Sequence, residues 1–197
     1  MLIGILCFIA FAIFASLYLE SFWSNAITLI NVTLATLLSI SFYEPVAALI
    51  DKQLGSFTYL WDYLSLWLMF VVIFAMLRFC TDFVTRNRVK FKLPVEMAGR
   101  MLCAAAVAGV MVSFIMTSFH IAPLPPSPFS NGLASSPAGG DFVGLSPDYY
   151  FLGFVRYTSN GSLARGQTFN ANNDFTAKYH ARRKNLNSVP DSLRVNQ

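Results

Sequence analysis

The side chains best suited to chemistry in this sequence are polar residues that recur along one apolar stretch, residues 26–46. Asn25, Thr28, Thr36 and Ser39 fall near one side of a helix, and Asn31 adds a further amide. Such groups can line a path for water or a solute, or they can bond across a contact between helices. We favour helix packing, because a hydroxyl can bond a carbonyl of its own helix and then needs no solute.

A second pattern, made of small residues, opens the last apolar stretch before residue 120. Gly99 is followed by Cys103, three alanines and Gly109, and Ala105 and Gly109 form a small-xxx-small step. Small side chains let two helices approach closely. The pattern therefore predicts close packing, either within a helical bundle or between two copies of the chain.

Residues that could support catalysis or bind a metal are sparse. The cysteines Cys7, Cys80 and Cys103 form no CxxC pair, and neither His120 nor His180 has an acidic or thiol residue at ligand spacing. The sequence contains no GxSxG, HExxH, Walker or GxGxxG motif. We therefore expect no metal, no cofactor and no enzymatic activity.

The elements that carry these residues are four apolar stretches with the length of membrane-spanning helices. Of the 197 residues, 55% are hydrophobic and 12% are charged, and one soluble core of this size has no room for all the apolar residues. A bilayer core needs about 20 helical residues, and each span must satisfy its own backbone because lipid offers no hydrogen bonds. The sequence predicts an all-α membrane protein whose 1–120 domain has four transmembrane helices. Their expected ranges are 2–19, 26–46, 59–79 and 98–119.

The distribution of charge predicts an orientation. Six of the seven Lys and Arg residues before residue 121 lie between Arg78 and Arg100. Basic loops stay in the cytoplasm, so we expect the 79–97 loop there and the C-terminal tail in the periplasm of a bacterium, across its inner membrane. The basic residues of the loop itself are Arg86, Arg88, Lys90 and Lys92.

Beyond the last span the composition changes to a linker and a tail. Residues 121–145 are rich in Pro, Ser and Gly and predict a linker. Residues 146–197 are aromatic and basic, and Pro147 follows a serine and precedes an aspartate, as at a helix start. We expect a partly helical tail. Its first helix would lie on the membrane or on a partner, and a second docking segment would lie around Phe175 and Tyr179. Because the tail is expected outside the cytoplasm, its basic cluster suits anionic lipid headgroups and not nucleic acid, and a basic tail that is only solvated is the alternative.

Two segments carry a family resemblance. Residues 20–29, Glu-Ser-Phe-Trp-Ser-Asn-Ala-Ile-Thr-Leu, lead to Phe-Tyr-Glu-Pro at 42–45, and residues 93–100 read Leu-Pro-Val-Glu-Met-Ala-Gly-Arg. They resemble the first loop with the second span, and the start of the fourth span, in the bacterial colicin V production protein family, CvpA. The resemblance covers roughly residues 1–120. The chain departs from the family in its long tail and in its first loop, where Glu20 and Ser21 stand in place of basic residues and a glycine.

The resemblance implies a small four-span inner-membrane protein with a basic third loop. It implies a role in toxin production or export and in envelope homeostasis, and it carries no catalytic residues over to this chain. We therefore expect a non-enzymatic factor that sits in the lipid bilayer and works with an envelope or secretion protein. The alternative is a small channel or transporter lined by the polar second span. It would be a homo-oligomer, because four short helices enclose little space alone.

Overall fold

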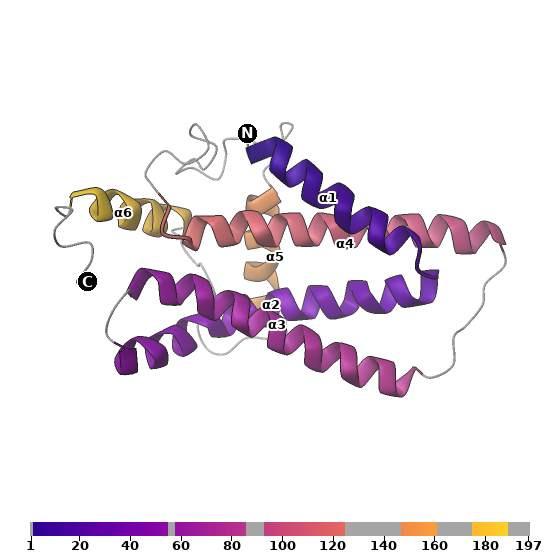
Figure 1. Ribbon diagram of the computed structural model, residues 1–197, viewed down its shortest axis with the longest axis horizontal. Coiled ribbons are helices and arrows are strands. Elements are labelled where there is room, and N and C mark those ends of the chain that lie inside the picture. The colour runs from indigo at the N-terminus through magenta and orange to yellow at the C-terminus, as the bar shows by residue number, and fades with distance from the viewer. Residues whose placement is uncertain (1, 55–57, 86–92, 125–146, 161–174, 189–197) are drawn as a thin grey trace.

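Six α-helices make up the part of the chain that the computed structural model describes, residues 2–54, 58–85, 93–124, 147–160 and 175–188 (Figure 1). They are α1 (Leu2–Tyr18), α2 (Phe22–Leu54), α3 (Thr58–Val84), α4 (Leu93–Ile121), α5 (Pro147–Asn160) and α6 (Phe175–Ser188). These residues contain no strand, which confirms the predicted all-α class. Most of the predicted linker and all four basic residues of the 79–97 loop lie outside the described residues.

The first four helices form an elongated bundle. α2 packs against both α3 and α4, and α1 packs obliquely along α4 (Figure 1). α5 crosses α4, and α6 lies at the end of the bundle where α4 ends. The two C-terminal helices therefore return to the bundle.

Three helices are long and apolar enough to cross a membrane. They cover Phe22–Lys52, Leu60–Val84 and Leu93–Ile121. α3 shows the need for lipid most clearly, because its exposed side chains include Val71, Met76 and Phe79 at 56%, 63% and 76%. A soluble monomer rarely exposes such a continuous apolar surface. The chain is therefore an α-helical, membrane-embedded protein.

The first predicted span differs from the other three. α1 is apolar and has 17 residues, so at about 1.5 Å per residue it reaches roughly 25 Å, short of a bilayer core of about 30 Å. The structure supports three long spans.

α2 is longer than the sequence indicated. The second span was expected to end at residue 46, but the helix continues past Pro45 to Leu54. In a membrane helix the carbonyl that proline leaves without a donor is accommodated by neighbouring groups, so proline does not have to end the helix. The acidic residues Glu44 and Asp51 lie on this last part of α2, at the end of the bundle where α6 lies.

Aromatic side chains form the centre of the core. The Trp67 ring meets the Phe70 and Phe114 rings at centroid distances of 5.9 and 5.5 Å, and Phe114 meets Phe151 of α5 at 6.2 Å. Aromatic pairs at these distances stabilise a core beyond the area that they bury. One continuous core therefore joins α3, α4 and α5.

Candidate functional site

The structure places the polar stripe of α2 inside the bundle, where two of its residues bond to α3. Asn31 Nδ2 donates to Thr81 Oγ1 at 2.9 Å, and Arg78 Nη1 donates to Thr28 Oγ1 at 2.8 Å. The five buried residues of the stripe are Asn25, Thr28, Asn31, Thr36 and Ser39. Polar groups of α2 thus join α2 to the end of α3 that leads into the 79–97 loop.

Two hydroxyls of the stripe bond within α2 itself. Thr36 Oγ1 donates to the Thr33 carbonyl at 2.9 Å, and Ser39 Oγ donates to the Ala35 carbonyl. Neither of the two cavities described below is lined by a residue of the stripe. This arrangement supports helix packing, and pore lining stays an alternative that a flux measurement can test.

The small residues of α4 divide into two kinds. A Cβ atom added at Gly99 would lie 2.6 Å from Cδ2 of Phe22, so glycine is needed there for α2 to approach α4. A Cβ atom added at Gly109 would meet nothing within 4 Å, and both Ala105 and Gly109 are exposed. Within the described residues, close helix packing therefore occurs at Gly99 and not at the small-xxx-small step.

The two segments that carry the family resemblance meet at this point. Glu96 Oε1 accepts a hydrogen bond from the backbone N–H of Phe22 at 2.8 Å, at the first turn of α2. Asn25 Nδ2 donates to the Leu17 carbonyl at the end of α1 at 2.9 Å and reaches the Arg100 carbonyl at 3.4 Å. One carboxylate and one amide therefore satisfy helix-end groups of α2 and α1, and they fix the turn between these helices against the start of α4.

At the opposite end of the bundle, a buried ionisable pair holds α5 on α4. His120 Nε2 lies 3.0 Å from Asp148 Oδ2, and the two side chains are 2% and 7% exposed. Asp148 is in the first turn of α5, where the helix dipole stabilises a carboxylate. The sequence shows no acidic residue near His120 at ligand spacing, because its partner Asp148 is 28 residues away in the chain.

α6 docks on the same end through a tyrosine pair and two ion pairs. The phenol oxygens of Tyr43 and Tyr179 are 2.8 Å apart and share a buried hydrogen bond. Lys178 Nζ lies 3.1 Å from Glu44 Oε1, and Arg182 pairs with Asp62. We call these residues the α6 latch: Tyr43, Glu44, Asp62, Lys178, Tyr179 and Arg182.

A polar cavity of about 260 Å³ lies beside the α6 latch. Besides five latch residues, Ala47, Ala48 and Asp51 line it. Burial raises the pKa of the Tyr179 phenol above its ordinary value, because a phenolate would lose hydration there. The cavity is too polar for an apolar ligand, and its charges are largely paired with one another.

The described residues hold little that could bind a metal. No group of three or more His, Cys, Asp or Glu side chains is placed for metal binding among them. The three cysteines are free, and Cys7 and Cys80 are exposed. The polar side chains of the described residues instead join helices to one another, through hydrogen bonds and ion pairs at both ends of the apolar bundle.

The fold and these contacts define the class of protein: an all-helical membrane-embedded bundle with its C-terminal helices docked back onto one end. No protein-family model, no curated protein and no solved structure matches this chain.

Proposed function

We propose that this chain is a non-enzymatic inner-membrane factor of the CvpA type, which supports toxin production or export and envelope homeostasis. Its bundle anchors the chain in the bilayer, and its C-terminal helices serve as the element that an envelope or secretion protein recognises. The observation that carries the proposal is the α6 latch, because it holds a charged helix at the end of the bundle facing away from the basic loop.

The orientation follows from charge. The 79–97 loop holds Arg86, Arg88, Lys90 and Lys92 and is placed in the cytoplasm. With α1 as a fourth span, the end of α4 and both C-terminal helices then face the periplasm. Arg78, at the loop end of α3, is paired with Asp82 at 3.1 Å, as expected for a residue at the membrane surface.

Ion pairs suit a docking element that has to exchange partners. The Glu44–Lys178 pair is more than half exposed on both sides, so it contributes at most about 1 kcal/mol. The Asp62–Arg182 pair is less exposed, at 15% and 31%. A partner with its own acidic and basic groups could compete for these residues without disturbing the apolar bundle.

A complementation experiment tests the proposal. In a bacterial host that lacks the chain, we expect lower export of a peptide toxin and a more permeable envelope, both restored by the full chain. The variant Arg182→Asp, which places two carboxylates together at Asp62, should fail to restore them. The matched change Lys52→Asp, at an exposed residue outside the latch, should restore them. A host whose toxin export and permeability do not depend on the chain would refute the role, and so would turnover of a substrate by the purified protein.

The alternative function, a small oligomeric channel or transporter, is motivated by the polar stripe of α2. It requires Thr28, Thr36 and Ser39 to face a water-filled path in an assembly of several copies. Liposome flux carried by the purified protein and lost when these three residues become Leu would support the channel. Flux that persists unchanged in this triple variant would reject the stripe as its lining.

A further inference from the structure

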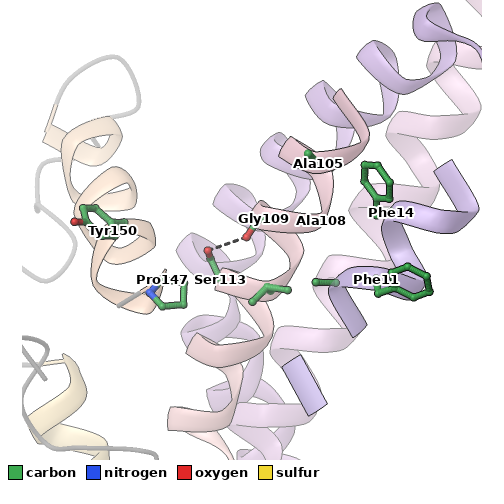
Figure 2. Close-up of a pocket in the computed structure, with 10 residues that line it drawn as sticks. Phe11, Phe14, Ala105, Ala108, Gly109, Ser113, Pro147 and Tyr150 are labelled. Carbon is green, nitrogen blue, oxygen red and sulfur yellow. Dashed lines mark hydrogen bonds between the residues drawn. The ribbon is translucent and has the colours of Figure 1, made fainter. Parts of the chain in front are cut away.

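An apolar groove lies on the outside of the bundle, between α1, α4 and α5 (Figure 2). Its volume is about 560 Å³, within the range of about 300–1,000 Å³ that is typical of ligand pockets. Figure 2 shows α4 as its floor, with Phe11 and Phe14 of α1 on one side and Pro147 and Tyr150 of α5 on the other. The α4 residues of the groove are Ala105, Ala108, Gly109, Val112 and Ser113.

The floor of the groove offers space and little polarity. Gly109 leaves open space where a side chain would stand, and the Ser113 hydroxyl donates to the Gly109 carbonyl at 2.8 Å (Figure 2). The one hydroxyl on the floor is therefore already bonded to the helix backbone. The lining presents methyl, methylene and aromatic carbon to whatever fills the groove.

The length of the groove along α4 is close to the thickness of the hydrocarbon layer in one leaflet of a bilayer. Its floor extends from Ser113 back to Ala105, which is about 12 Å at about 1.5 Å per residue. Half of a hydrocarbon core of about 30 Å is about 15 Å. The groove starts beside α5 at Ser113, eight residues before the end of α4, and ends at Ala105, close to the middle of that helix at residue 107.

α5 marks the headgroup end of the groove. Its outer face is aromatic, with Tyr149, Tyr150, Phe154 and Tyr157 exposed at 44–80%. Tyrosine side chains collect at the boundary between acyl chains and water. α5 also crosses α4, so a helix of a second copy could not follow α4 along its full length at this face (Figure 1).

From this geometry we propose that the groove binds one acyl chain of a bilayer phospholipid, with the lipid headgroup beside α5. The chain lies between the phenylalanines of α1 and the small residues of α4. Ala105 and Gly109 are small because they make room for lipid, and not for a second helix. The proposal rests on the place of the bundle in a membrane and is independent of the role in toxin export.

Photo-crosslinking tests this binding site. The full chain is placed in nanodiscs that contain phosphatidylethanolamine with a diazirine in the middle of one acyl chain, and the cross-linked residues are mapped by mass spectrometry. We expect cross-links to concentrate on Phe11, Phe14 and Val112. Labelling spread evenly over α1, α3 and α4 would overturn the proposal.

A matched pair of substitutions sharpens the test. Ala105→Trp fills the groove and should lower labelling of the groove residues several-fold. Ala106→Trp lies at the same depth on α4, outside the groove, and should leave labelling unchanged. Gly109→Leu is a second filling variant, because its added side chain enters open space and does not strain the fold. Equal labelling in the filled and control variants would overturn the proposal, as would loss of a dimer in Ala105→Trp with labelling unchanged.

Discussion

The Tyr43–Tyr179 hydrogen bond gives the sharpest prediction on the α6 latch. Tyr179→Phe removes one phenol oxygen and leaves the Tyr43 hydroxyl, which is fully buried, with only the longer 3.3 Å contact to Glu44 Oε1. Loss of a partner from a buried polar group costs about 1–3 kcal/mol. Since about 1.4 kcal/mol is a factor of ten in an equilibrium, a cost of about 1–3 kcal/mol should make α6 detach from the bundle more often by a factor of roughly 5 to 140.

Hydrogen–deuterium exchange of the α6 backbone amides measures this detachment. We expect exchange in Tyr179→Phe to be faster by the same factor, with exchange in α2 and α4 unchanged. Tyr157→Phe is the matched control, because the same atom is removed from a tyrosine that is 80% exposed. The double variant Tyr43→Phe with Tyr179→Phe should exchange more slowly than Tyr179→Phe alone, since no buried hydroxyl then lacks its partner.

The same tyrosine predicts a dependence on pH. Burial raises the pKa of Tyr179, so the docked helix favours the neutral phenol over the phenolate. Below pH about 10 the phenol is protonated whether α6 is docked or not. Above that pH the undocked helix loses its proton first, so docking should weaken as pH rises, and Tyr179→Phe should remove that part of the dependence. For the hydrogen bond itself, exchange of the α6 amides in Tyr179→Phe that is no faster than in the Tyr157→Phe control would refute the claim that this bond holds α6.

Two further predictions concern the packing of α4. Gly99→Leu should destabilise the bundle by about 1–3 kcal/mol and lower its melting temperature in detergent, because the new side chain overlaps Phe22. Gly109→Leu should leave that temperature nearly unchanged, and equal losses in the two variants would contradict the packing described here. Asp148→Ala removes the carboxylate from buried His120 and should cost about 1–3 kcal/mol of α5 docking. α5 amides that stay as protected as in the unmodified chain would show that the pair does not hold α5.

Much of the bundle could be predicted from the sequence, because hydrophobicity over some 20 residues is a local signal. All four apolar stretches became helices, and the helix start at Pro147 was predictable from its own neighbours. α2 begins at Phe22, four residues before the expected residue 26. The continuation of α2 beyond residue 46 was missed, because proline ends helices in water and its tolerance depends on surrounding helices.

The docking contacts could not be predicted in the same way. Tyr43 and Tyr179 are 136 residues apart, and His120 and Asp148 are 28 residues apart. No local pattern relates such residues, since their meeting depends on how the linker lets α5 and α6 return. The basic and aromatic composition of the tail predicted docking, but not that its partner would be the chain's own bundle.

The central claim, that the apolar helices lie in a bilayer, is tested most directly by the reactivity of Cys7. The Cys7 side chain is exposed on α1 with respect to the described residues, so we expect lipid to shield it from a water-soluble maleimide. In membrane vesicles of both orientations, a chain with Cys7 as its only cysteine should stay unlabelled until it is denatured. Glu20→Cys, made in a chain without other cysteines, should be labelled from one side. Labelling of Cys7 in intact vesicles as fast as labelling at residue 20 would contradict the account.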